Sequence, residues 1–199
     1  MAEISASTVM ELRQRTGLGM MECKKALTEA EGDVAKAEEL LRIKSGAKAS
    51  KAAGRVAAEG VIGLYTASDG KVAAMVEINC ETDFVARTDD FQQLARDIAL
   101  HVASADPIAV NSEDVPAELI ERERRIAEEQ VAQEGKPENI RSKIVDGKVK
   151  KFVSERTLTE QLFVRDDKKT VGQLIKEASG KLGEVISVRR FARFKIGEV

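Results

Sequence analysis

The side chains that most often act as nucleophiles, general bases or metal ligands are scarce in this sequence. Its 199 residues include one histidine, one tyrosine and two cysteines. Acid–base and nucleophilic catalysis require such groups within hydrogen-bond reach of one another, and Cys23 and Cys80 lie far apart in the chain. His101 follows Leu94 and Ile98 at helical spacing, so we expect it to pack at a core-facing surface. The inventory therefore argues against an enzyme.

The spacing of potential ligands also argues against a metal or nucleotide site. Cys23 and Cys80 form no paired ligand spacing, and we expect buried, reduced thiols. Glu81 and Asp83 are an acidic pattern too common to indicate a cation site. The glycines of segment 17–19 precede two methionines, not the Gly-Lys-Ser/Thr that holds phosphates and magnesium. We therefore predict no resident metal, no cofactor and no direct nucleotide binding.

An acid and an aromatic residue stand side by side in the segment Thr82-Asp83-Phe84-Val85, directly after a predicted strand. Spacing favours the interpretation that Thr82 or Asp83 caps the next helix and that Phe84 fills the core. The alternative is an exposed probe that inserts into another protein. The low aromatic content of 4% slightly favours this alternative.

Two neighbouring methionines, Met20 and Met21, begin a predicted helix. Methionines at helical spacing usually belong to a core, but adjacent positions on a helix face in different directions. One of the two is therefore a candidate contact residue.

The overall charge and hydropathy narrow the class of protein. A formal net charge of −2 argues against binding nucleic acid through the whole surface. The first residues lack the basic start and apolar segment of a secretory signal, and no later run approaches the roughly 18 apolar residues of a membrane span. We expect a cytoplasmic protein with no membrane association.

The first part of the chain has the apolar periodicity of three short helices. Helices are predicted over residues 5–16 and 20–30 and from Val34 to Leu41. A core this small usually supports binding of a partner and little else. We therefore predict a helical domain over 1–45 and an Ala/Lys-rich linker over 46–59, either an alanine-rich helix or a flexible strap.

Alternating apolar residues after Gly60 indicate an antiparallel sheet. Residues 61–66 and 71–80 flank a turn and form a predicted hairpin, and residues 185–194 are predicted to add a third strand. The second strand places Val72, Ala74, Val76, Ile78 and Cys80 on one face. The last strand is expected to place Ile186, Val188, Ala192 and Phe194 on one side.

Four further helices are predicted in the same region. The helix over 89–103 carries an apolar stripe of Phe91, Leu94, Ile98 and Val102. Helices over 116–133 and up to Glu155, separated by Gly135-Lys136-Pro137, suggest an antiparallel pair. Residues 158–169 read as irregular, and 171–178 as a short helix. Together these elements predict an α+β core domain over 60–199.

Several motifs, in order along the chain, resemble one known family. Residues 12–27 closely resemble the N-terminal signature of the elongation factor Ts family, and Asn79 to Arg87 resembles its second signature. Shorter matches at 135–137, 150–152 and 170–174 extend the resemblance over nearly the whole chain. The resemblance implies a ubiquitin-associated-like three-helix domain, an α+β core and a non-enzymatic role in exchanging guanine nucleotide on the GTPase elongation factor Tu.

The resemblance also implies roles for particular residues. Arg13, Met20 and Met21 match positions at which the N-terminal domain docks on the nucleotide-binding domain of the GTPase. The segment 82–85, namely Thr82, Asp83, Phe84 and Val85, matches the one that enters near the GTPase's magnesium site. The single hairpin resembles the short form of the family, for which a homodimer is expected. The hairpin turn 66–69 has no histidine, so the contact that some members make there is not carried over.

Two other classes of protein compete with this interpretation. The basic residues Lys48, Lys51 and Arg55, Lys148 to Lys151, and Arg189-Arg190 suggest binding to RNA or the ribosome, but no aromatic residues are interleaved with them for base stacking. A ubiquitin-associated-type adaptor would use residues 1–45 alone and leaves the Asn79 to Arg87 match unexplained.

Overall fold

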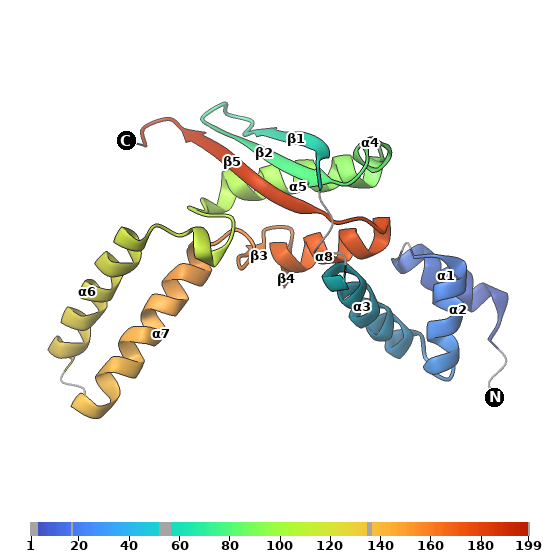
Figure 1. The fold of residues 1–199 in the computed structure, drawn as a ribbon, viewed down its shortest axis with the longest axis horizontal. Helices are drawn as coiled ribbons and strands as arrows, with labels where there is room; N and C mark the ends of the chain where they lie inside the picture. The colour runs from blue at the N-terminus through green and yellow to red at the C-terminus, as the bar shows by residue number, and fades with distance from the viewer. Residues whose placement is uncertain (1–3, 17, 52–56, 135–136, 199) are drawn as a thin grey trace. The chain divides into compact units, whose positions relative to one another are not determined.

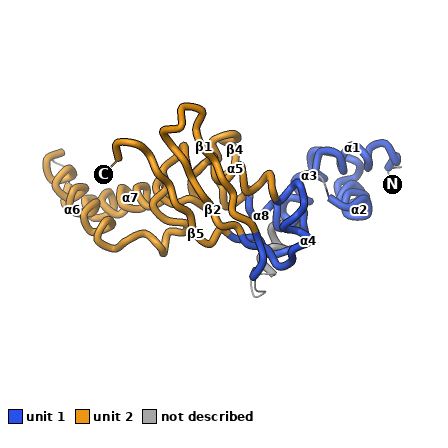
Figure 2. The backbone as a smooth tube through the Cα atoms, turned by 90° about the horizontal axis from the view of Figure 1, so that it is seen from above, with its two compact units in different colours: residues 1–60, 79–91, 175–187 blue, residues 61–78, 92–174, 188–199 orange. Residues whose placement is uncertain are grey.

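The computed structural model describes residues 4–16, 18–51, 57–134 and 137–198. It combines helices with a three-stranded antiparallel sheet and a smaller two-stranded one, which confirms the predicted α+β class (Figure 1). The chain divides into two compact units (Figure 2). Unit 1 comprises residues 1–60, 79–91 and 175–187, and unit 2 comprises 61–78, 92–174 and 188–199.

The three predicted N-terminal helices are present as α1 (Ala6–Thr16), α2 (Met20–Glu29) and α3 (Val34–Lys51). They bury a common cluster made of Val9, Leu12, Cys23, Ala26, Leu27, Ala30, Ala37 and Leu41. Gly32 adopts a φ of 90° between α2 and α3, and the Asp33 carboxylate accepts a hydrogen bond from the main-chain N–H of Lys36. Helix α3 continues to Lys51, so the start of the predicted linker is helical, whereas Arg55 lies outside the described residues.

The predicted three-stranded sheet is present, with β1 at Glu59–Thr66, β2 at Val72–Cys80 and β5 at Ser187–Lys195, and its strand order is β1-β2-β5. The alternation in β2 is confirmed, because Ala74, Val76, Ile78 and Cys80 are buried while Met75 is exposed. One face of this sheet is therefore a core face.

Val188 and Phe194 were predicted to lie on the same side of β5. This prediction is wrong, because Val188 is buried whereas Phe194 is 69% exposed. The Arg193 side chain instead points toward α5 (Asp89–Ala105), where its Nε donates to the carbonyl oxygen of Ala103 at 3.1 Å. Arg189 and Arg190 are consecutive, yet both contact the Glu77 carboxylate. The alternation therefore shifts by one residue between Val188 and Arg193, as it does at a bulge.

Helix α5 lies against the sheet with the predicted stripe of Phe91, Leu94, Ile98 and Val102 buried. The two elements approach closely at Gly63 in β1, where an added Cβ would stand 2.3 Å from the carbonyl oxygen of Ala95. A glycine is therefore required for β1 and α5 to pack at this distance.

The predicted helix pair is present as α6 (Ala117–Gln133) and α7 (Glu138–Arg156), which lie side by side and run antiparallel (Figure 1). They bury Ala127 and Val131 against Val145 and Val149. The connection includes Gly135 and Lys136, which lie outside the described residues. A short 3₁₀ helix, η1 (Ser112–Asp114), precedes α6.

Residues 158–169 were predicted to be irregular, and this prediction is wrong in part. The segment contains a small hairpin of β3 (Leu162–Phe163) and β4 (Asp166–Thr170). Helix α8 (Val171–Leu182) is longer than predicted.

His101 packs beside the β3–β4 hairpin and is fully buried, as predicted. Its Nδ1 accepts from the main-chain N–H of Val164, so the proton lies on Nε2, 2.9 Å from Gln161 Oε1. Burial lowers the pKa of His101, which therefore stays neutral.

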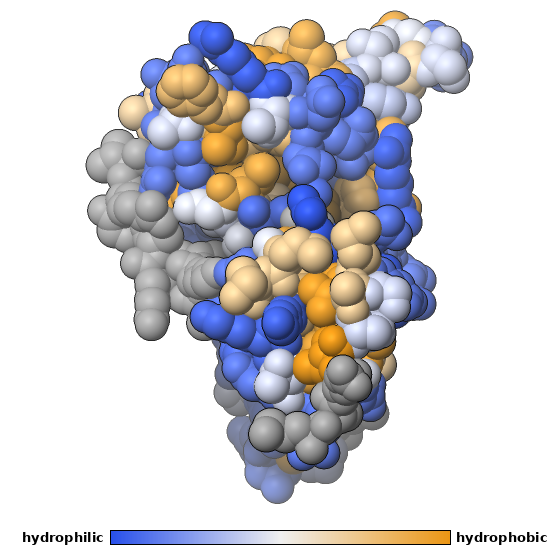
Figure 3. Space-filling model, turned by 90° about the vertical axis from the view of Figure 1, so that its right-hand side faces the viewer, coloured by the Kyte–Doolittle hydropathy of each residue, from blue (hydrophilic) through white to orange (hydrophobic). Residues whose placement is uncertain are grey.

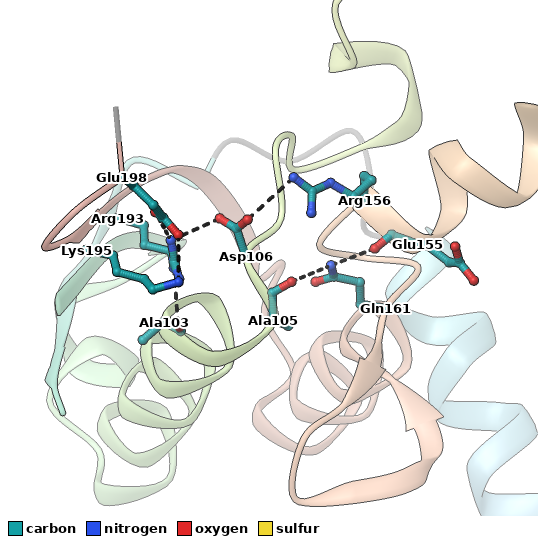
Figure 4. Close-up of polar contacts among 9 residues, drawn as sticks. All are labelled: Ala103, Ala105, Asp106, Glu155, Arg156, Gln161, Arg193, Lys195 and Glu198. Atoms are coloured by element: carbon teal, nitrogen blue, oxygen red, sulfur yellow. Dashed lines mark hydrogen bonds and ion pairs between the residues drawn. The ribbon is translucent and has the colours of Figure 1, made fainter. Parts of the chain in front are cut away.

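Polar side chains join the three elements α5, α7 and β5 of unit 2 (Figure 4). The Arg193 guanidinium bridges the Ala103 carbonyl oxygen and the Asp106 carboxylate, which also contacts Arg156 at the end of α7. Asp106 has a φ of 50°, so the chain turns sharply as α5 ends. These contacts hold together the ends of α5 and α7 and the strand β5.

Candidate functional site

The segment after β2 forms one helical turn, α4 (Asp83–Ala86), that begins at a capping threonine. Thr82 has an extended backbone, and its hydroxyl oxygen accepts from the main-chain N–H of Val85 at 3.4 Å. This arrangement is the usual N-cap geometry of a helix. The part of the spacing argument that assigned a cap here is therefore confirmed.

The other part of that argument is wrong, because Phe84 does not fill the core. Its side chain is 80% exposed, whereas Ala86 at the end of the turn is 6% exposed. Positions two apart on a helix point in nearly opposite directions, so a turn that buries Ala86 directs Phe84 outward. The structure thus presents an aromatic side chain to solvent on a short capped turn.

Asp83, the acidic residue of this turn, is half-buried at the first position of α4. Its Oδ2 lies 3.0 Å from an Arg87 guanidinium nitrogen one turn later. An exposed pair of this kind contributes little to stability. The Asp83 carboxylate can therefore exchange Arg87 for another partner at small cost.

The backbone around the turn is fixed at both ends. The Cys80 thiol donates to the carbonyl oxygen of Thr82 at 3.2 Å, and burial raises the pKa of that thiol, so it keeps its proton. Thr88 donates to the carbonyl oxygen of Val85 at 2.7 Å and accepts from the N–H of Phe91. Cys80 was expected to be an inert buried thiol, but its proton stabilises the turn that carries Phe84.

The three N-terminal candidates all lie at the surface. Arg13 is exposed on α1, and Met20 and Met21 are 38% and 65% exposed at the start of α2, whose buried face begins at Cys23. The argument from neighbouring positions expected one exposed methionine, and the structure exposes both. On the face drawn in Figure 3, apolar residues gather in patches bordered by hydrophilic ones. Exposed patches of this kind often mark binding sites for other proteins.

Several basic residues that suggested RNA binding have acidic partners. Lys148 lies 3.6 Å from a carboxylate oxygen of Glu134, and Arg189 and Arg190 both contact Glu77. These contacts lower the pKa of Glu77, because the guanidinium groups favour its charged form. Much of the positive charge in these segments is therefore balanced locally.

Within the described ranges, no three histidine, cysteine or acidic side chains are grouped closely enough to hold a metal ion. The helices described also include none with the length and apolar composition needed to cross a membrane. Among the candidate site residues, the exposed apolar side chains are Phe84 on its turn and the two methionines of α2.

Comparison with known proteins shows the family of this chain. Residues 3–198 match the family model described as elongation factor TS. This chain belongs to the elongation factor Ts family. It is 51% identical over 198 residues to elongation factor Ts of Desulfosudis oleivorans, covering 100% of both chains. It is 54% identical to that of Anaeromyxobacter dehalogenans, covering 100% of this chain and 90% of the relative.

One residue that contacts the site in the structure was not predicted from the sequence of this elongation factor Ts family member. Glu184, which follows α8, binds Thr82 through its carboxylate. The signal available in the sequence was weak, because an acid after a helix-ending glycine usually faces solvent. Only the folded chain brings residues 102 positions apart into this contact.

Proposed function

We propose that this chain is a guanine nucleotide exchange factor for elongation factor Tu that acts in the cytoplasm without covalent chemistry. The observation that carries the proposal is the 80% exposure of Phe84 on a capped turn within the second family signature. An aromatic side chain this exposed stabilises its own fold little, and aromatic residues are the commonest anchors at protein interfaces.

The proposed mechanism weakens the contacts by which the GTPase holds nucleotide. Those contacts are the amides and lysine of its phosphate loop and a magnesium ion that bridges protein and phosphate oxygens. Phe84 inserts between elements of the GTPase and displaces the groups that support the magnesium, while Asp83 adds negative charge beside the ion. Thr82 and Val85 hold the backbone of the turn in the required shape.

Thermodynamic linkage makes the proposed effect reciprocal. If the factor weakens nucleotide binding, nucleotide weakens binding of the factor by the same free energy. Entry of GTP therefore releases the factor.

The proposal is tested by measuring release of fluorescent GDP from purified elongation factor Tu with increasing amounts of this protein. We expect faster release, and tighter capture of the nucleotide-free GTPase than of its GDP-bound form. A release rate that does not change with added protein would contradict the proposal. Equal capture of both forms would instead fit a simple adaptor.

We further propose that residues 1–45 form the docking domain, with Arg13, Met20 and Met21 in contact with the GTPase. Changing Met20 and Met21 together to aspartate should raise the half-saturating concentration about 10-fold, because two apolar contacts are replaced by charges. The maximal release rate should remain, since Phe84 is intact. Ile126→Asp on α6 is the control, because Ile126 is also 38% exposed. An equal effect of the control would contradict this docking site.

The sheet face opposite α5 supports the proposed homodimer. A Cβ added at Gly63 would face α5, and the Arg193 side chain contacts α5. The next residue in each strand therefore faces away from α5, and these residues, Leu64 and Phe194, are 61% and 69% exposed. Ile62 and Met75 are also exposed on this outer sheet face. Apolar patches of this kind are unusual on monomers, and the resemblance to the short form makes a second copy the proposed occupant.

Leu64→Glu is expected to convert the homodimer to monomer, because it buries a charge in an apolar interface. Light scattering after size-exclusion chromatography measures the mass of each variant. Leu162→Glu is the control, since Leu162 is 58% exposed but belongs to β3. A monomeric wild-type protein would contradict the homodimer, and a dimeric Leu64→Glu variant would exclude this face.

A further inference from the structure

Glu184 binds the start of the Phe84 turn, although 103 positions separate it from Glu81. Its Oε2 accepts hydrogen bonds from the main-chain N–H groups of Glu81 at 3.0 Å and Thr82 at 3.1 Å. Its Oε1 accepts from the Thr82 hydroxyl. Hydrogen bonds to an ionised acceptor are roughly twice as strong as neutral ones. One carboxylate therefore joins the end of α8 to the end of β2 within unit 1.

The backbone that carries this carboxylate is itself held in place. Gly183 has a φ of 76°, and its N–H donates to the carbonyl oxygen of Ser179 at 2.9 Å, which ends α8. The Ser179 hydroxyl donates to the carbonyl oxygen of Glu184. The position of the Glu184 backbone is thus set by α8 rather than by the turn that its side chain binds.

The Thr82 hydroxyl transmits this contact to the turn. It donates its single proton to Glu184, which leaves its oxygen to accept from the N–H of Val85. A hydroxyl that donates to a carboxylate is a better acceptor, since bonds in a chain polarise one another. Helix α4 has four residues, which is too short to be stable by itself. The direction of Phe84 therefore depends on how firmly Thr82 is held.

We propose that Glu184 is a positioning residue for nucleotide exchange, whose carboxylate holds the Thr82–Val85 turn in the shape that presents Phe84 before the GTPase is bound. This inference rests on the proposed function of the turn. A segment ordered in advance loses less conformational entropy on binding. In this mechanism the N-terminal helices dock separately, so the entropy is lost at the later step in which Phe84 inserts. Loss of Glu184 therefore lowers the maximal release rate and leaves the half-saturating concentration nearly unchanged.

The test measures fluorescent GDP release from elongation factor Tu over a titration of each full-length variant. Glu184→Ala should lower the maximal rate about 10-fold, because hydrogen bonds to a charged acceptor are lost. Glu184→Gln should lower it about 3-fold, since its single oxygen can still accept from both amides but its NH2 group cannot accept from Thr82. Glu128→Gln is the control, as it makes the same chemical change at an exposed position of α6.

Two further measurements separate positioning from a loss of stability. Thr82→Val combined with Glu184→Ala should slow release by less than the product of the two single effects, because both substitutions remove the same hydrogen bond between Thr82 and Glu184. Hydrogen exchange at the Val85 amide should be faster in free Glu184→Ala than in the control, at a temperature at which thermal unfolding shows both proteins to be folded.

The outcomes distinguish the two proposals. A Glu184→Ala variant with the wild-type maximal rate, or with a changed half-saturating concentration alone, overturns the role of Glu184 and leaves the exchange function standing. Fully additive effects of the two substitutions overturn it as well. A wild-type protein that does not stimulate release overturns the exchange function and with it the inference.

Discussion

Phe84→Ala is expected to slow factor-stimulated GDP release from elongation factor Tu about 30-fold at saturating factor, because an aromatic anchor at an interface contributes about 2 kcal/mol. The side chain is 80% exposed, so its removal leaves the core of the factor intact. Docking through the N-terminal helices remains, and the half-saturating concentration should change little. Stopped-flow fluorescence of labelled GDP measures both quantities.

Two comparisons make this result specific to the aromatic ring. Phe84→Tyr keeps the ring and should retain most of the rate, whereas Asp83→Asn tests the charge separately and should have a smaller effect than Phe84→Ala. The thermal unfolding midpoint should be the same in all three variants. A Phe84→Ala variant that releases GDP as fast as wild type would show that the ring does not enter the GTPase.

Gly63→Ala is expected to have the largest effect on stability, lowering the free energy of unfolding by about 3 kcal/mol through overpacking. An added Cβ would lie 2.3 Å from the carbonyl oxygen of Ala95 and 2.7 Å from its carbonyl carbon. Both atoms belong to the backbone of α5, so no side-chain rotation relieves the clash. Helix α5 must move away from β1, which separates the buried faces of both elements.

Urea unfolding followed by circular dichroism measures this loss, and Gly147→Ala is its matched control. Gly147 lies inside α7, where an added Cβ meets no atom within 4 Å. Because alanine has a higher helix propensity than glycine, the control should gain stability by up to about 1 kcal/mol. Equal stability of Gly63→Ala and wild type would mean that β1 and α5 are not packed as closely as described.

Periodicity predicted most elements correctly, because it reports which residues a helix or strand buries. The stripe from Phe91 to Val102 and the alternation in β2 each repeat over several residues, so one error does not change the assignment. The β3–β4 hairpin was missed because its strands, Leu162–Phe163 and Asp166–Thr170, are too short to show a period. The facing of Phe194 was wrong because a shift in strand alternation leaves no mark in the sequence pattern.

The candidate site was predicted only in part from its own residues. Thr82 was expected as a possible cap from its position after a strand, and the structure confirms it. Phe84 was assigned to the core on spacing. The low aromatic content favoured exposure only slightly, and the resemblance to the elongation factor Ts family favoured it further. The reason is that one helical turn has no periodicity from which the direction of a single side chain can be inferred.

The sequence by itself determined that an acid and an aromatic residue follow a strand, that the chain has few catalytic groups, and that its motifs resemble one family. Only the tertiary structure decided that Phe84 points to solvent and that Glu184 holds its turn. Local patterns are set by neighbours in the chain, whereas the contact between Glu184 and Thr82 joins residues 102 positions apart. It exists because the end of α8 and the end of β2 are brought together by packing, which no local pattern encodes.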